Sequence, residues 1–237
     1  FVPQNMVISI AGKEAETCQN RLFPICSRWT GKTTEGVGTV TLPVREDTKY
    51  IWFETEQTKI KICFNGIEKQ HSQKYALLVA NAILGGSSKS RLHTIIRAKR
   101  GFSYLAYSMP LFFEHGGLLY MNMDTYEENI QGVLDCLADI IDDLCVHGIK
   151  DDELPIAQKH CLNELILKYE TSSAIMTRNG QMALLERRIT SDTEVIDQIH
   201  RVTGDDVHRL CREILTGGKT ILIGTQHPNA LHIKFRL

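Results

Sequence analysis

The sequence predicts an α+β fold in which an antiparallel β-sheet is covered by helices. Short apolar strands dominate the first half of the 237 residues, and helical periodicity dominates the second half. The strands form hairpins and do not alternate regularly with helices, which argues against a parallel α/β sheet. The 43% hydrophobic and 23% charged fractions are typical of a globular chain that needs neither a disulfide framework nor a metal to fold.

Charge and cysteine content exclude several classes of function. The 27 Lys and Arg residues are balanced by 28 Asp and Glu residues, so counterion release cannot drive strong binding to nucleic acid. No apolar run approaches the roughly 18–20 residues of a membrane span. The seven cysteines include no C-x-x-C pair, and we expect them to be reduced and mostly buried. We therefore expect no nucleic-acid partner, no membrane partner and a cytoplasmic location.

The N-terminal 43 residues contain two predicted elements and a linker. Residues 5–11 (NMVISIA) have the composition of a strand, and residues 13–29 predict a helix that Pro24 kinks or breaks. Residues 30–43 open with a stretch rich in Gly and Thr, which is typical of a linker. The only plausible domain boundary lies there.

Four further segments predict strands: 50–53, 58–64, 103–112 and 117–124. In the second of these, Ile60, Ile62 and Phe64 alternate with Lys59, Lys61 and Cys63, as in a half-buried strand. The last two flank a glycine-containing turn and predict a hairpin. Residues 220–225 predict a closing strand.

Two helices are predicted between these strands. Residues 72–84 are apolar on nearly every face and predict a buried helix that ends at Gly85-Gly86. Residues 89–100 predict a basic helix that ends at Gly101. The segment Gly85-Gly86-Ser87-Ser88 could bind an anion or a peptide carbonyl at the start of that basic helix, but we favour a structural role in the junction.

The second half predicts mainly helices. Thr125 and Glu128 have the spacing of a capping box, and Gly148 ends the helix that follows. Its apolar residues recur at helical spacing: Ile130, Val133, Leu134, Leu137, Ile141 and Leu144. The aspartates of this helix lie off that stripe and are interpreted as a solvated face. A second helix is predicted over residues 151–169, and capping boxes at Ser191 and Thr203 predict two more.

No complete nucleotide-binding motif is present. Gly31-Lys32-Thr33 and Gly218-Lys219-Thr220 match the end of a P-loop, but Cys26 and Glu213 occupy the positions where its first glycine is required. We therefore exclude a P-loop.

No self-sufficient zinc motif is present either. His160 and Glu164 are the nearest match to a zinc-binding helix, but the second histidine is missing. We expect His93, His200 and His208 to face solvent, because they lie among charged residues on predicted helices.

The segment 90–108 carries the strongest functional hypothesis. In a purely structural interpretation, Arg97, Lys99 and Arg100 complement the carbonyl end of a helix, and Gly101 terminates it. In the functional interpretation, Arg97 and Tyr104 project toward one cavity across the helix-to-strand turn. A guanidinium and a phenol are suitable donors for a carbonyl oxygen that becomes an oxyanion during peptide hydrolysis.

An ordered set of motifs covers nearly the whole chain: Asn5-Met6-Val7, Glu54-Thr55-Glu56-Gln57-Thr58, Tyr75-Ala76-Leu77-Leu78, Ile83-Leu84-Gly85-Gly86, Ser90-Arg91-Leu92, Arg97 to Gly101 to Tyr104, and Val202-Thr203-x-Asp205-Asp206-Val207. With these motifs the chain resembles the C-terminal, non-zinc half of a pitrilysin-type zinc metallopeptidase. This inverzincin family includes mitochondrial processing peptidase.

The resemblance implies a clamshell of two similar α+β domains joined by a linker. In such families the N-terminal domain binds zinc through an inverted H-x-x-E-H motif. The C-terminal domain contributes an Arg and a Tyr, which Arg97 and Tyr104 match by spacing and context. The resemblance thus implies no cofactor in this chain and a zinc ion in the missing N-terminal domain. The implied partners are that zinc-bearing domain or subunit and a peptide substrate, with a homodimer or heterodimer left open.

The absent zinc motif implies that the chain alone is inactive and is a fragment or a truncated form. We expect residues 1–29 to be the remnant strand and helix of the preceding N-terminal domain, residues 30–43 the linker, and residues 44–237 the C-terminal peptidase-family domain. The expected function is to close the clamshell over peptides and assist their hydrolysis. The alternative is a non-catalytic scaffold or regulatory subunit of the same fold.

Overall fold

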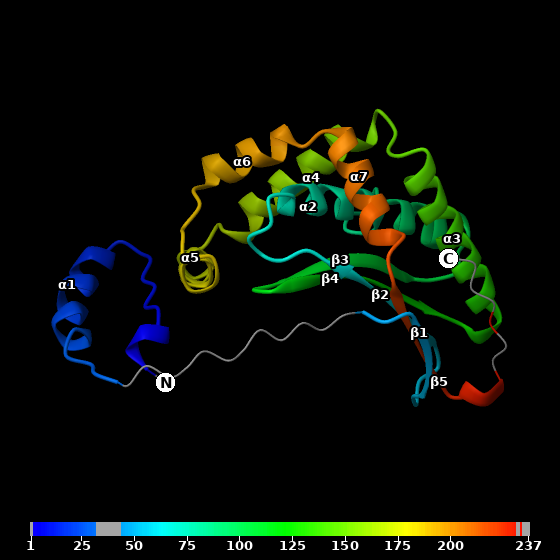
Figure 1. Cartoon of the computed structure of the whole chain (residues 1–237), viewed down its shortest axis with the longest axis horizontal. Helices are drawn as coiled ribbons and strands as arrows, with labels where there is room; N and C mark the ends of the chain where they lie inside the picture. Colours follow the sequence, from blue (N-terminus) through cyan, green and yellow to red (C-terminus); the bar gives the residue numbers. More distant parts are fainter. Residues whose placement is uncertain (1, 32–43, 231–232, 234–237) are drawn as a thin grey trace. The chain divides into compact units, whose positions relative to one another are not determined.

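A computed structural model describes residues 2–31, 44–230 and 233 of the chain. The chain divides into two compact units (Figure 1). Unit 1 comprises Phe1–Val40 and Leu162–Ile196, and unit 2 comprises Thr41–Cys161 and Asp197–Leu237. Most of the predicted linker, residues 32–43, lies outside the described residues.

The described part of unit 2 forms a five-stranded sheet with the order β1-β5-β2-β4-β3. Its strands are β1 (Asp47–Trp52), β2 (Thr58–Gly66), β3 (Leu105–Phe113), β4 (Gly116–Thr125) and β5 (Lys219–Thr225). Neighbouring strands are antiparallel except for β1 and β5, which are parallel. The last of these strands in the sequence, β5, therefore lies between the first two, β1 and β2.

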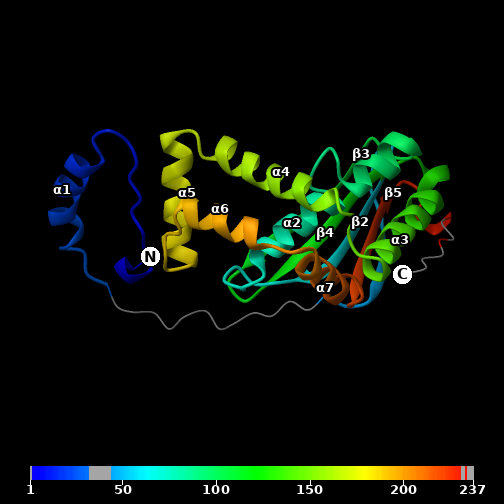
Figure 2. The same ribbon diagram turned by 90° about the horizontal axis from the view of Figure 1, so that it is seen from above.

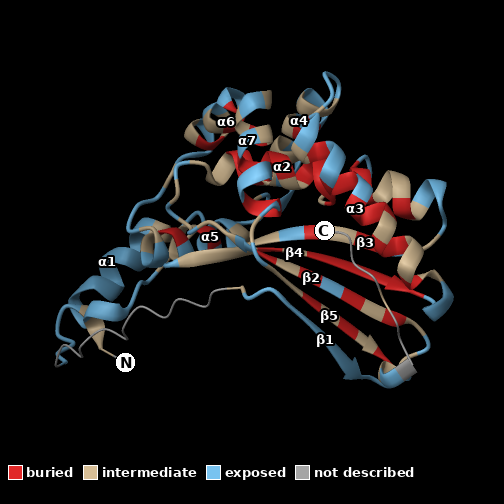
Figure 3. Ribbon diagram, turned by 45° about the vertical axis from the view of Figure 1, so that its right-hand side comes forward, coloured by how far each residue is buried: buried red, intermediate tan, exposed pale blue. Residues whose placement is uncertain are grey.

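One face of the sheet is covered by helices, as Figures 1 and 2 show. The covering helices of unit 2 are α2 (Lys74–Leu84), α3 (Ile130–Val146) and α7 (Gly204–Leu215). Ile60, Ile62 and Phe64 of β2 are fully buried on this face. Figure 3 shows the same division, with buried residues concentrated between the helices and the central strands and exposed residues along β1. The predicted α+β class is confirmed.

The junction after α2 depends on close packing. A Cβ atom at Gly85 would overlap the backbone nitrogen of Ser108 on β3, so glycine allows the end of α2 to approach the strand. The Ser108 hydroxyl also donates to the Asn81 side chain at 2.7 Å. These contacts support the structural interpretation of Gly85-Gly86.

Unit 1 contains α1 (Ala15–Cys26), α5 (Ser172–Leu185), and the adjoining ends of α4 (Glu153–Lys168) and α6 (Asp192–Arg201). Pro24 lies inside α1 as predicted. A short 3₁₀ turn, η1 (Pro3–Asn5), precedes it. The buried Arg178 of α5 stacks over the Tyr169 ring at 4.6 Å and pairs with Asp192.

The strand predicted over residues 5–11 is wrong in this structure. Residues 6–11 have no regular secondary structure and take part in no strand pair of the described sheet. Instead, the Ser9 hydroxyl donates to the carbonyl of Met176 at 2.7 Å. A strand needs a neighbouring strand for its backbone hydrogen bonds, and the composition of a segment does not reveal whether such a neighbour exists.

The capping box predicted at Thr125 and Glu128 is also wrong. Thr125 is the buried last residue of β4, and its hydroxyl donates to the carbonyl of Phe102 at 2.5 Å. A 3₁₀ turn, η3 (Glu127–Asn129), then leads into α3. The box at Thr203 and Asp206 is confirmed, because each side chain accepts the other residue's backbone N–H at the start of α7.

All seven cysteines are free thiols in the described residues. The expectation that most are buried is wrong, because only Cys136 and Cys211 are fully buried. Burial, and to a smaller extent the charge interaction with the nearby Cys145, raises the pKa of Cys211 to about 12. This thiol is therefore unsuited to nucleophilic chemistry near neutral pH.

Within the described residues, every helix is either too short or too polar to span a lipid bilayer.

Candidate functional site

The predicted site begins in η2 (His93–Lys99), a π-helical segment of unit 2. Its wider turn appears in the hydrogen bond from the Arg100 backbone N–H to the Ile95 carbonyl at 3.0 Å. Segments of this kind are rare and frequently occur at functional sites. Ile96 is fully buried and anchors the turn, while Arg97 of the same turn remains half-buried.

The connection to β3 places Tyr104 near this turn. Gly101 has a φ of +64°, a left-handed conformation that glycine adopts without strain. The buried Ser103 hydroxyl contacts the Asp124 carbonyl at 2.7 Å and fixes the chain against β4. Tyr104 is the last residue before β3, and it is 76% exposed.

The structure brings the two predicted site residues together. The Arg97 guanidinium carbon lies 4.4 Å from the centroid of the Tyr104 ring, within cation–π range. Arg97 Nη1 also lies 3.1 Å from Nε2 of His93, one turn earlier. A guanidinium and an exposed phenol thus form one cluster that can donate several hydrogen bonds.

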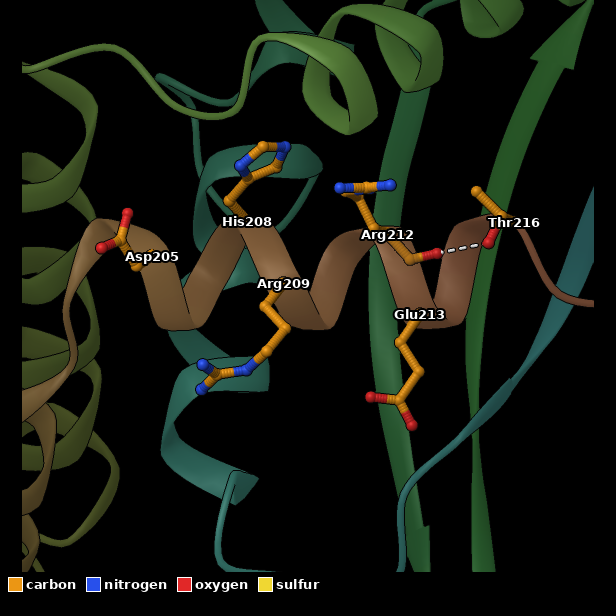
Figure 4. A pocket seen from close by; sticks show the side chains of 6 residues that line it. All are labelled: Asp205, His208, Arg209, Arg212, Glu213 and Thr216. Carbon is orange, nitrogen blue, oxygen red and sulfur yellow. Dashed lines mark hydrogen bonds between the residues drawn. The ribbon is translucent and has the colours of Figure 1, made fainter.

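A hollow of about 500 Å³ lies along α7. Figure 4 shows His208 and Arg212 extending from one side of the helix, and Arg209 and Glu213 from the other. The Thr216 hydroxyl donates to the Arg212 carbonyl at 2.6 Å. These groups do not converge on one point, and we assign no chemistry to the hollow.

A second hollow, of about 370 Å³, lies beside η2 and is lined by Lys89, Lys99 and Lys150 among others. Neither hollow is lined by Arg97 or Tyr104. The predicted pair therefore lies outside both hollows.

The buried Arg91 anchors the chain just before η2. Its Nε and Nη2 atoms donate to the two carboxylate oxygens of Glu153 at 2.8 and 2.7 Å. The same guanidinium donates to Asp143 at 3.0 Å and to the Gly148 carbonyl at 2.9 Å. Burial opposes ionisation of Glu153, but the Arg91 and Lys150 hydrogen bonds outweigh it and hold its pKa below the ordinary value.

Two histidines differ from the expectation that they face solvent. His93 is half-buried against Arg97, and His208 is half-buried with its Nε2 atom 2.9 Å from the Cys145 carbonyl oxygen. His200 is exposed as expected. Both predictions are wrong for the same reason, because each ring contacts another residue: His93 contacts Arg97 one turn away, and His208 contacts the Cys145 carbonyl oxygen of α3.

The described residues contain no group of three or more His, Cys, Asp or Glu side chains arranged to hold a metal. The side chains of this part of the chain therefore do not fit a zinc site.

Comparison with known proteins defines the family. The family model for the peptidase M16 inactive domain matches residues 1–160. The chain belongs to the peptidase M16 inactive domain family. The resemblance to the non-zinc half of such peptidases is thereby confirmed.

Relatives of this M16 inactive domain are named as zinc proteases. The uncharacterized zinc protease YmxG of Bacillus subtilis is 28% identical over 219 residues, which are 91% of this chain and 53% of that protein. The uncharacterized zinc protease SCO5738 of Streptomyces coelicolor is 29% identical over 192 residues, covering 81% of this chain and 40% of that protein. The chain spans about half the length of the curated relatives it matches.

Solved structures share the fold. A peptidase M16 inactive domain from Pseudomonas fluorescens aligns with a TM-score of 0.78 at 19% identity, over 94% of this chain and 53% of that chain. A protease from Helicobacter pylori aligns with a TM-score of 0.74 at 14% identity, over 87% of this chain and 52% of that chain. At these identities the likeness establishes the architecture of the M16 inactive domain.

Proposed function

We propose that this M16 inactive domain closes a clamshell over peptide substrates and assists their hydrolysis at a zinc centre held by another domain. The observation that carries the proposal is the contact between Arg97 and Tyr104, whose ring and guanidinium lie 4.4 Å apart. The two residues that match the family's substrate-contacting pair are adjacent in space, and the phenol is largely open to a ligand.

The chemistry of the pair follows from its donors. A guanidinium stacked on a ring uses its face, so its in-plane N–H groups stay directed outward. Of its five donors, one contact is made to His93. The remaining N–H groups of Arg97 and the Tyr104 hydroxyl can donate to the scissile carbonyl as it becomes an oxyanion. Such donors, positioned in advance, stabilise the transition state more than the ground state.

The zinc-bearing partner in this proposal is an N-terminal domain or subunit, with a homodimer or heterodimer as the assembly. Bound zinc would supply an activated water and polarise the carbonyl. The named zinc-protease relatives, of which this chain spans about half, support such a second half.

We propose that residues 1–29 end the preceding domain, that residues 30–43 are a linker, and that residues 44–237 form the C-terminal domain. The zinc-protease relatives support this division, because the chain spans only about half of their length.

The test is steady-state peptide hydrolysis by the full-length enzyme carrying Arg97→Ala or Tyr104→Phe. Loss of one such donor should lower kcat/KM by about 10²–10³, or about 2.7–4 kcal/mol. Arg201→Ala and Tyr126→Phe are matched controls, because both residues are exposed and lie outside the pair. Unchanged turnover in both site variants would favour the scaffold or regulatory alternative.

A further inference from the structure

His93 extends the proposed pair into a row of three side chains. Its Nε2 atom lies 3.1 Å from Arg97 Nη1, and the guanidinium carbon of Arg97 lies 4.4 Å from the Tyr104 ring centroid. His93 and Arg97 are four residues apart in η2, a spacing that places side chains on one helix face. Both side chains are half-buried, whereas Tyr104 is exposed.

The direction of the His93 contact follows from the chemistry of arginine. A guanidinium has only donors, so the imidazole nitrogen facing it must be the acceptor. The contact therefore uses the form of the ring in which Nε2 carries no proton. A protonated imidazole would offer no lone pair and would place a second positive charge beside Arg97.

The arrangement limits the freedom of a flexible side chain. An arginine side chain has many rotamers, and ordering it at the moment of reaction costs entropy. The imidazole contacts one Nη of Arg97 at 3.1 Å, and the phenol ring of Tyr104 lies 4.4 Å from its guanidinium carbon. Two contacts thus restrict the guanidinium before a ligand arrives.

We propose that His93 is a positioning residue that orients Arg97 toward the reacting carbonyl. The inference rests on the proposed function of Arg97 and Tyr104 and adds a residue that contacts neither the substrate nor the zinc. His93 acts through Arg97 alone, since its Nε2 lone pair is occupied by that contact.

The experiment compares His93→Phe with His93→Gln in the full-length enzyme. Phe keeps a planar ring but removes the acceptor, whereas the Gln carbonyl restores an acceptor near the same position. We expect H93F to lower kcat by about 10-fold or more, because small misplacements of a catalytic group are costly, with KM little changed. H93Q should recover most of the rate. His115→Phe, at the exposed β3–β4 turn, is the matched control.

A double-variant cycle tests whether His93 acts through Arg97. In the R97A background, H93F should cause no further loss, because its target is already absent. An NMR measurement gives a readout independent of turnover. The Arg97 Nε–Hε signal of the ¹⁵N-arginine-labelled enzyme should shift in H93F and return toward its original position in H93Q.

The outcomes separate this inference from the function on which it rests. Impaired R97A together with unimpaired H93F would overturn the role of His93 and leave the function intact. Equal impairment of H93F and H93Q, or additive losses in the double variant, would also overturn it. Unimpaired R97A would remove the proposed function and the role of His93 together.

Discussion

At the residue scale, a second arginine, Arg91, anchors the chain just before the turn that carries Arg97. The Arg91 side chain is 6% exposed and makes a two-pronged contact with Glu153. Burial alone would lower the pKa of Arg91, but the hydrogen bond and the charge of Glu153 raise it. This ion pair holds the segment before η2 against the start of α4, and thereby anchors the N-terminal end of the turn that carries Arg97.

The Arg91–Glu153 pair predicts a specific dependence of stability on pH. The folded-state pKa of Glu153 lies below its ordinary value of 4.5, so its ionised form stabilises the fold above that pH. This stability is lost as the pH falls through the lower, folded-state pKa. Glu153→Gln should destabilise the protein by about 1.5–3 kcal/mol at pH 7, and the difference from wild type should shrink below pH ~4.5.

Urea denaturation at a series of pH values measures this effect. Glu114→Gln, at the exposed β3–β4 turn, serves as the control and should follow the wild type at every pH. A constant difference between E153Q and wild type from pH 7 to pH 3 would contradict the assigned role of the ion pair.

At the element scale, predictions succeed where the determining contacts are local in sequence. The six apolar positions predicted for α3 are all buried, and Thr203 caps α7 as expected. The predicted alternation of buried and exposed residues in β2 is also observed. Gly148 ends α3 as predicted, with a φ of +79°. Periodicity and capping depend on residues within one or two turns, and the sequence contains that information directly.

Predictions fail where an element depends on distant partners. Residues 6–11 have no strand neighbour among the described residues, and the Thr125 hydroxyl donates to the distant Phe102 carbonyl in place of capping a helix. The insertion of β5 between β1 and β2 is likewise a long-range pairing. For the candidate site, sequence motifs identified Arg97 and Tyr104 but not His93 or the π-helical turn, which only geometry reveals.

The buried stripe of α3 predicts an asymmetric response to alanine substitution. Leu137 is fully buried among the helices that cover the sheet, so Leu137→Ala should lower the free energy of unfolding by about 2–5 kcal/mol. Asp142 lies on the exposed face of the same helix, and Asp142→Ala should change the free energy of unfolding by no more than about 0.5 kcal/mol. Thermal or chemical denaturation of both variants measures the contrast, and equal losses would contradict the burial pattern.

At the scale of the whole molecule, the chain is an M16 inactive domain that spans about half of its zinc-protease relatives. Its described side chains do not form a metal site, whereas Arg97 and Tyr104 form a paired donor group. In the proposed function, the other half of the protein would hold the metal and its water, and this half would supply donors that stabilise developing negative charge.

The central claim is that Arg97 serves the transition state and does not hold the metal. Its most direct measurement compares, in full-length wild type and R97A, the inhibition constants of a phosphinic peptide and of the corresponding product peptide. A phosphinic group mimics the tetrahedral oxyanion, so R97A should weaken its binding by about 10²–10³ and that of the product far less. Zinc content, measured on the same samples, should stay unchanged. Equal weakening of both ligands, or loss of zinc from R97A, would contradict the account.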